Sequence, residues 1–178
     1  MRLPVKVISF FCLLKYRLFV RRVSLGKGVI ANWKTKIAGP GMVKIGDNVN
    51  LWAFAEKNQF LTYDPAAVIE IGEGTRVNGA TLQARKTITI GKRCLLGSVL
   101  IMDNDFHHAD PLRRFLREDI PTKPVKIGNN VWLAGRSSVL KGVNIGNNSV
   151  VAFAAVVSKD VPENVVVGGN PAIVVKEL

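Results

Sequence analysis

The sequence predicts an all-β fold: a left-handed parallel β-helix shaped as a triangular prism, with a short N-terminal helix and a projecting loop. Two observations lead to this prediction. Aliphatic side chains repeat every six residues in the C-terminal part of the chain, and valine, isoleucine and glycine dominate its later two-thirds. The 178 residues are enough for one domain with a substantial core.

The repeat is strict from residue 127 onward, where two sets of side chains follow the same period. The first set is aliphatic and comprises Ile127, Leu133, Val139, Ile145, Val151 and Val157. The second set is aliphatic or small, lies four places later and comprises Val131, Ser137, Val143, Ser149, Ala155 and Val161. A period of six fits neither an α-helix nor an amphipathic strand. It is typical of a triangular solenoid, in which each hexapeptide forms a short strand and a corner, and stacked coils pair their strands in parallel.

Two interruptions break the repeat. Ile45 and Ile71 are 26 residues apart, which is eight more than one coil of three hexapeptides requires. The second interruption contains residues 103–124, a polar and proline-containing segment that we expect to project as a loop. The only two histidines of the chain, His107 and His108, lie near the start of this loop.

The net charge of +12 is concentrated at the N-terminus. Residues 1–46 contain ten basic and no acidic side chains, whereas the remainder contains fifteen basic and thirteen acidic ones. We therefore divide the chain into a basic amphipathic segment, 1–22, and a β-helix domain, 23–178. The segment is too short and too charged for a transmembrane helix.

Within this segment, apolar side chains recur at helical spacing: Val7, Phe10, Phe11, Leu14 and Leu18. Such a face suits an anionic membrane surface, and it equally suits packing on the domain or on another subunit. Nucleic-acid binding is disfavoured, because no nucleic-acid motif accompanies the charge.

The two cysteines, Cys12 and Cys94, form no CxxC pair and suit a reducing cytosol, where we expect them to be buried packing residues. We expect no metal site. Carbonic anhydrases with this solenoid need three zinc-binding histidines, and the chain has two, adjacent in sequence.

Residues 40–178 resemble the hexapeptide-repeat acyltransferases, and most of all the group of galactoside, maltose, nodulation and O-antigen or capsule acetyltransferases. The likeness rests on the hexapeptides, on DNDFH at 103–107, on IGNNVWLAG at 127–135 and on the ending at 158–178. It implies acetyl-CoA as acyl donor and a homotrimer whose active site lies between neighbouring prisms. It also implies that the projecting loop reaches across to the next subunit.

The resemblance assigns His107 as the general base that takes the proton of the acceptor hydroxyl. It suggests Asp103 or Asp105 as the carboxylate that orients the imidazole. The backbone N–H of Gly135 matches the donor to the thioester oxygen. His108 stands where relatives commonly have proline, and we interpret it as an ordinary loop residue.

Further residues match the acceptor and coenzyme positions of this family. Asn78 and Trp132 match acceptor contacts, although a packed exterior aromatic explains Trp132 equally well. The positions along coenzyme A are Ala152, Ala154, Ser158, Lys159 and Lys176. Where the family often carries two arginines in its tail, this chain has Ile173 and Lys176, so one phosphate contact is missing.

These features predict an acetyltransferase that moves the acetyl group of acetyl-CoA to a sugar hydroxyl without an acyl-enzyme. The expected acceptor is a surface polysaccharide (O-antigen, capsule or exopolysaccharide) or its precursor. Two alternatives stay open: N-acetylation of a nucleotide-linked amino sugar, and a catalytically inactive scaffold. We expect a cytoplasmic protein, with peripheral placement at the inner face of the plasma membrane if residues 1–22 bind lipid.

Overall fold

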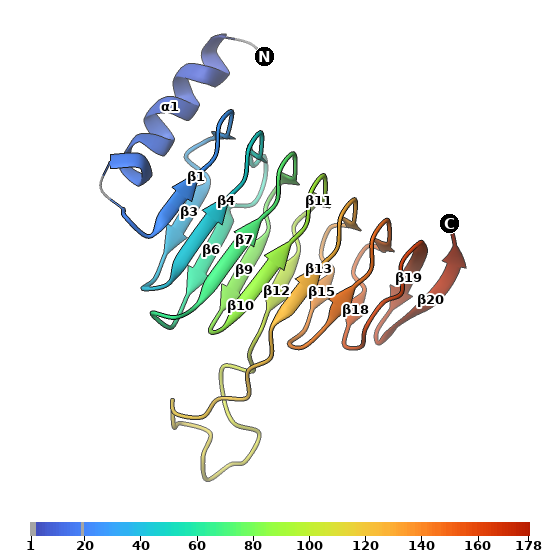
Figure 1. The fold of residues 1–178 in the computed structure, drawn as a ribbon. Coiled ribbons are helices and arrows are strands. Elements are labelled where there is room, and N and C mark those ends of the chain that lie inside the picture. The colour runs from blue at the N-terminus through green and yellow to red at the C-terminus, as the bar shows by residue number, and fades with distance from the viewer. Residues whose placement is uncertain (1–2, 19) are drawn as a thin grey trace.

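The structure is a computed structural model that describes residues 3–18 and 20–178. It confirms the predicted fold, a three-sided parallel β-helix of about seven turns with one helix at its N-terminal end (Figure 1). Each side of the prism is one sheet, and we name the three sheets A, B and C in the order in which the chain visits them.

Sheet A comprises β1 (Val23–Leu25), β4 (Met42–Ile45), β7 (Val68–Ile71), β10 (Thr87–Ile90), β13 (Val125–Ile127) and β16 (Asn144–Ile145). Sheet B comprises β2 (Ile30–Ala31), β5 (Asn50–Leu51), β8 (Arg76–Val77), β11 (Leu95–Leu96), β14 (Trp132–Leu133), β17 (Val150–Val151), β19 (Val165–Gly169) and β20 (Ala172–Glu177). Sheet C comprises β3 (Thr35–Ala38), β6 (Asn58–Thr62), β9 (Thr81–Ala84), β12 (Leu100–Met102), β15 (Ser138–Val139) and β18 (Val156–Val157). All pairings between the named strands are parallel except that of β19 with β20, and an isolated antiparallel bridge joins Asn104 to Thr122 in the loop.

The core fills the inside of the prism. Every side chain of the two repeat sets between residues 127 and 161 is at most 6% exposed. The aliphatic residues stack in register from coil to coil, as Ile90, Ile127 and Ile145 do along sheet A. The six-residue period therefore measures one side of the prism, as predicted.

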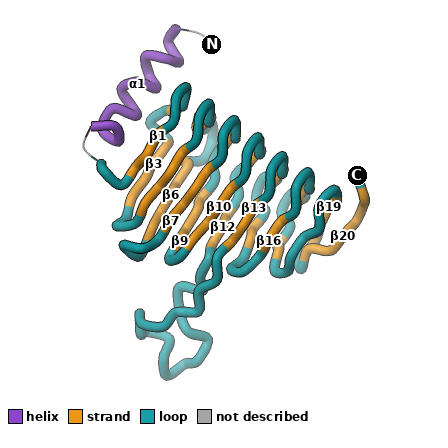
Figure 2. Tube along the Cα trace, viewed as in Figure 1, coloured by secondary structure: helices purple, strands orange, loops and turns teal. Residues whose placement is uncertain are grey.

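Two lines of turns are important for the site. The B–C corner, between sheets B and C, is formed by residues 32–34, 52–57, 78–80, 97–99, 134–137 and 152–155. The C–A corner, between sheets C and A, is formed by residues 39–41, 63–67, 85–86, 103–124, 140–143 and 158–160. The predicted loop 103–124 thus projects from the C–A corner (Figure 2). Compared with the strict coil from Ile127 to Ile145, the extra residues between Ile45 and Ile71 lengthen the turns 52–57 and 63–67 and also the strands β6 and β7.

The helix α1 (Leu3–Leu18) packs on the first coil through Ser9, Leu13 and Tyr16. The Ser9 hydroxyl accepts the backbone N–H of Ala31 at 3.2 Å, and the Tyr16 hydroxyl accepts that of Ile37 at 3.0 Å. The packed face is therefore not the predicted apolar stripe, of which Val7, Phe10, Phe11 and Leu18 stay exposed. In the described part of the chain, no helix has the length and hydropathy needed to cross a membrane.

Candidate active site

The loop 103–124 is fixed at its base by Asp103. This side chain is fully buried, and its two carboxylate oxygens accept the backbone N–H groups of Arg85 (2.8 Å) and Lys86 (2.7 Å) from the preceding coil. In the described chain the backbone holds Asp103, and its role in orienting the histidine stays a prediction. Both carboxylate oxygens are engaged by the backbone, and the residue anchors the loop.

Asp105 also has a partner other than histidine. Its carboxylate forms an ion pair with Lys141 Nζ at 2.6 Å, and Lys141 lies on the C–A corner one coil further on. Its predicted role in orienting the imidazole likewise stays a prediction. The ion pair connects the loop to the next coil. An edge-to-face contact between the rings of Phe106 and Tyr63 connects it to the preceding coils.

His107 lies exposed near the start of the loop, and its ring is oriented by backbone. Its Nδ1 lies 3.0 Å from the carbonyl oxygen of Arg114. A carbonyl can only accept, so in the neutral ring Nδ1 carries the hydrogen and Nε2 has the free lone pair. The structure therefore presents an exposed base nitrogen on the projecting loop.

His108 has a different role from its neighbour. It is 7% exposed, and its Nε2 lies 2.7 Å from the carbonyl oxygen of Glu118. This contact joins the outgoing and returning segments of the loop, so His108 acts as a brace. It carries more of the loop structure than an ordinary loop residue would.

Gly135 lies on the B–C corner, on the opposite side of sheet C from the loop. Among the hydrogen bonds of the described residues, none uses its N–H, whereas its carbonyl accepts the N–H of Ala154 at 3.1 Å. Gly97 of the preceding coil lies so close that a Cβ there would meet the Gly135 nitrogen at 2.9 Å. Gly97, Gly135 and an available N–H donor therefore share this corner with the exposed ring of Phe153.

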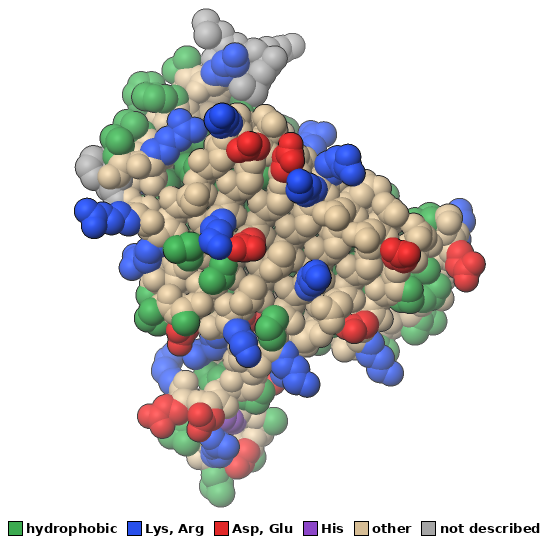
Figure 3. Space-filling view, viewed as in Figure 1, with side chains coloured by type: hydrophobic (Ala, Val, Ile, Leu, Met, Phe, Trp, Pro, Cys, Tyr) green, Lys and Arg blue, Asp and Glu red, His purple; other side chains and the backbone are tan. Residues whose placement is uncertain are grey.

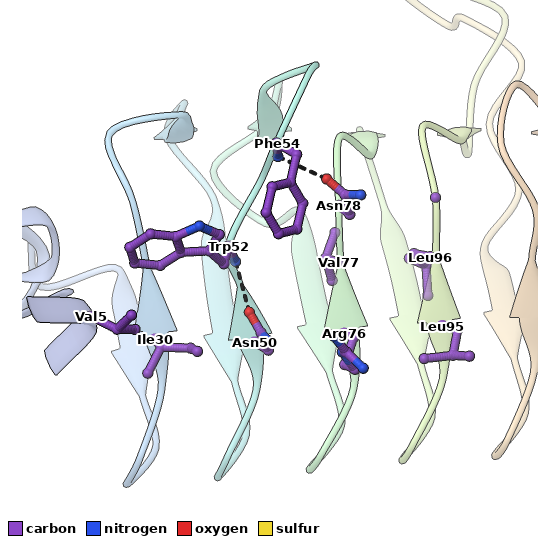
Figure 4. A pocket seen from close by; sticks show the side chains of 11 residues that line it. Val5, Ile30, Asn50, Trp52, Phe54, Arg76, Val77, Asn78, Leu95 and Leu96 are labelled. Carbon is purple, nitrogen blue, oxygen red and sulfur yellow. Dashed lines mark hydrogen bonds between the residues drawn. The ribbon is translucent and has the colours of Figure 1, made fainter. Parts of the chain in front are cut away.

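A groove of about 480 Å³ leads to this corner along sheet B (Figure 4). Its lining residues come from α1 and the first four coils: Val5, Ile30, Asn50, Trp52, Phe54, Arg76, Val77, Asn78, Leu95, Leu96 and Gly97. Asn78, predicted from the resemblance, accepts the Phe54 N–H through Oδ1 at 2.9 Å. Trp132 is half exposed on β14 and pairs in register with Leu95 at the end of the groove.

Sequence reasoning missed the aromatic side of this groove, formed by Trp52 and Phe54, and the basic side chain of Arg76. Trp52 and Phe54 belong to the enlarged turn 52–57. The eight extra residues before Ile71 were the available signal, because an enlarged corner in a solenoid marks a surface feature.

The residues predicted to contact coenzyme A do not converge in one chain. Ala152 and Ala154 lie with Gly135 along the B–C corner, whereas Ser158 and Lys159 lie on the C–A corner. Lys176 lies exposed on β20 of sheet B. Small side chains along the B–C corner fit a flat pantetheine arm, but a full coenzyme site requires surfaces from more than one corner.

Comparison with known proteins identifies the family. Residues 124–158 match the model of the "hexapeptide repeat of succinyl-transferase". A protein of Escherichia coli described as "Putative lipopolysaccharide biosynthesis O-acetyl transferase WbbJ" is 31% identical over 150 residues, covering 79% of this chain and 74% of that protein. The chain belongs to the hexapeptide-repeat acetyltransferase family. The galactoside O-acetyltransferase of Escherichia coli is 32% identical over 137 residues, covering 75% of this chain and 63% of that protein.

Solved structures of hexapeptide-repeat acetyltransferases share the fold. An acetyltransferase from Vibrio cholerae, solved with acetyl-CoA, is 26% identical with a TM-score of 0.58, covering 85% of this chain and 72% of that one. A galactoside acetyltransferase solved with coenzyme A is 24% identical with a TM-score of 0.62. The match covers 99% of this chain and 73% of that one. Several curated relatives are matched only in part: the aligned segments cover 28%, 63% and 53% of three of them.

Proposed function

We propose that this chain is an acetyl-CoA-dependent O-acetyltransferase that acts on a sugar hydroxyl. The observation that carries the proposal is the hydrogen bond from His107 Nδ1 to the Arg114 carbonyl, which leaves Nε2 as a base at the exposed loop. His108 makes a similar contact but is buried, whereas the His107 ring is exposed and keeps its second nitrogen free, which a structural brace does not require. Family membership and the relative solved with acetyl-CoA support the choice of donor.

The proposed chemistry uses two groups of the chain, the His107 Nε2 atom and the Gly135 N–H. Bound acetyl-CoA would supply an activated acetyl group as its thioester. His107 Nε2 takes the proton of the acceptor hydroxyl as its oxygen attacks the thioester carbon, and later returns that proton to the departing coenzyme sulfur. The Gly135 N–H, which has no acceptor within the described chain, donates to the carbonyl oxygen as negative charge develops there.

We further propose a homotrimer with the active site between chains. Within one chain, His107 and Gly135 lie at different corners of the prism, so one copy must meet the loop of another. The loop tip exposes Leu112 (93%), Phe115 (88%) and Leu116 (50%), which a neighbouring prism would cover. The outer face of sheet B exposes Leu95 and Trp132 in the same way.

We propose that the acceptor is a saccharide of a surface polysaccharide or its precursor, bound in the groove along sheet B. Trp52 and Phe54 offer apolar faces for sugar rings, and Asn50, Arg76 and Asn78 offer polar contacts to hydroxyl groups. The similarity to WbbJ, which is assigned to lipopolysaccharide biosynthesis, supports this class of acceptor. Both cysteines are free, in agreement with the proposed cytoplasmic location.

The test is a mass-spectrometric screen of saccharides and nucleotide-linked amino sugars for acetyl-CoA-dependent gain of one acetyl group. Loss of the added acetyl group in mild base indicates an O-ester. An acetyl group that stays in place indicates the alternative, N-acetylation. Acetyl-CoA binding without transfer to any acceptor would contradict the proposed enzyme and favour a scaffold.

A further inference from the structure

The helix α1 has two faces, and only one of them is used by the fold. Ser9, Leu13 and Tyr16 are buried against the first coil. The opposite stripe exposes Val7 (47%), Phe10 (53%), Phe11 (60%) and Leu18 (62%), with Leu14 partly exposed between them. A monomeric soluble protein rarely leaves such a contiguous apolar stripe uncovered.

The stripe is bordered by positive charge on both sides. At about 100° per residue, Lys6 and Arg17 flank one side of the stripe and Lys15 flanks the other. Hydrophobic and basic side chains gather over α1 at the upper left of the space-filling view (Figure 3). Arg21 and Arg22 follow the helix, and the first carboxylate of the chain is Asp47.

A shallow groove continues this cationic border. About 250 Å³ of space lies between α1 and the first coil, lined on the helix side by Lys6, Ser9, Phe10, Leu13 and Arg17. Anionic headgroups would find two bases and an aromatic ring here, at the margin of the apolar stripe.

We propose that the outer face of α1 docks on an anionic bilayer, with Phe10 and Phe11 among the acyl chains and the flanking bases at the phosphates. An apolar face between cationic borders has the pattern of an interfacial helix, because burial of the apolar side chains and attraction to anionic lipid act together. A second protein copy would have to bury the same bases without any carboxylate from this end of the chain. The charge therefore favours lipid as the occupant.

Docking would orient the rest of the molecule. Val5, on the first turns of the same helix, also lines the groove that contains Asn78 and Gly97. A helix lying in the bilayer plane thus places one end of this groove beside the headgroups. The docking itself does not depend on acetyl transfer, and the two can be tested separately.

The experiment uses co-sedimentation of the full chain with vesicles of equal parts phosphatidylglycerol and phosphatidylcholine. Substitution of side chains is preferable to deletion of α1, because Ser9 and Tyr16 bond to the first coil. The double variant F10S/F11S removes two exposed rings that pack edge to face, with their centroids 5.5 Å apart. V174S/V175S, on the distant and exposed strand β20, is the matched control. K6Q/K15Q removes one flanking charge from each side of the stripe, and with Lys15 the cation that lies 4.7 Å from the Tyr16 ring centroid.

We expect the wild type and the control to bind anionic vesicles and to ignore pure phosphatidylcholine. F10S/F11S should lose at least tenfold in partitioning, and K6Q/K15Q should lose several-fold, as should the wild type in about 0.5 M salt. Absence of wild-type binding would overturn the proposal, and so would unchanged binding of F10S/F11S. A change in the oligomeric state of F10S/F11S without lipid would overturn it in favour of contact between copies. Acetyl transfer to a dissolved acceptor, measured in parallel, should stay intact in both double variants of α1.

Discussion

The Nδ1 atom of His107 lies 3.0 Å from the carbonyl oxygen of Arg114, seven residues further along the same loop. The bond closes the loop on itself and sets the orientation of the ring without a carboxylate. Because a backbone carbonyl cannot be changed by substitution of a side chain, the tautomer of His107 depends on the shape of the whole loop. Residues that hold this shape should therefore affect catalysis although they do not touch the substrate.

Replacement of His107 by alanine should lower kcat by a factor of about 10² to 10⁴, because the acceptor hydroxyl loses its base. The affinity for acetyl-CoA, measured by calorimetry, should be unchanged, since the substitution removes only the imidazole and leaves Gly135, Ala152 and Ala154 on the B–C corner as they are. The companion variant His108→Ala removes a brace rather than a base, so it should lower the thermal stability of the loop and raise KM. Normal turnover in His107→Ala would remove the proposed base.

The hydrogen bonds of Asp103 should contribute more to the free energy of unfolding than the surface ion pair of Asp105. Asp103→Asn keeps one acceptor oxygen and places an NH2 group against the other backbone N–H in a fully buried site. We expect a loss of about 1–3 kcal/mol in the free energy of unfolding. Asp105→Asn breaks a partly exposed pair with Lys141 and should cost under about 1 kcal/mol. Denaturant unfolding of the two variants checks this order, which equal losses would contradict.

Two inactive variants should restore each other if the active site is shared between chains. His107→Ala removes the base, and Gly135→Leu blocks the N–H donor from a position where a Cβ meets only the Phe153 ring, at 3.6 Å. Random co-assembly in equal amounts gives about one quarter of wild-type activity, because half the sites receive an intact loop and half of those an intact corner. Mixed chains that stay inactive would instead place both groups in one subunit.

Thiol chemistry should play no part in turnover. Burial raises the pKa of the Cys94 thiol, and hydrogen bonds from its surroundings offset this only in part. Burial likewise raises the pKa of Cys12, with a smaller opposing effect from Lys15. Alkylation by iodoacetamide should therefore need a higher pH than alkylation of a free cysteine, since the thiolate forms later. The variant C12S/C94S should keep its turnover, whereas a large loss would point to a nucleophilic cysteine.

Tyr16→Phe isolates one bond between the helix and the prism. The variant leaves the N–H of Ile37 without its acceptor, and we expect a loss of about 1 kcal/mol in the free energy of unfolding. Binding to vesicles should not change, because Tyr16 faces away from the exposed stripe. Thermal unfolding and co-sedimentation of the same sample check both statements.

The sequence predicted the prism well because each hexapeptide encodes its own strand and corner. Ile127 and Val131 could be assigned to the core from spacing alone, and the bounds of the loop followed from the loss of that spacing. Local periodicity is sufficient where each repeat contacts only its neighbours.

The roles of Asp103 and Asp105 could not be predicted in the same way. Their partners are Arg85, Lys86 and Lys141, which coil stacking brings from 17 to 36 residues away. The motif identified the carboxylates but not the groups that satisfy them. The face of α1 that packs was missed for a similar reason, since Ser9 and Tyr16 are polar and are recognised as core only once Ala31 and Ile37 lie opposite.

The contacts of Ser9 and Tyr16 with the first coil also matter for how molecules behave in a crowded solution. The N–H groups of Ala31 and Ile37 belong to β2 and β3, the outermost strands of sheets B and C at this end. An uncovered outermost strand is a template on which another polypeptide can continue the ladder, and such growth ends in fibrils. The helix accepts these N–H groups with the hydroxyl groups of Ser9 and Tyr16, which cannot continue a β-ladder. Loss of α1 should therefore appear first as polymerisation of otherwise folded prisms.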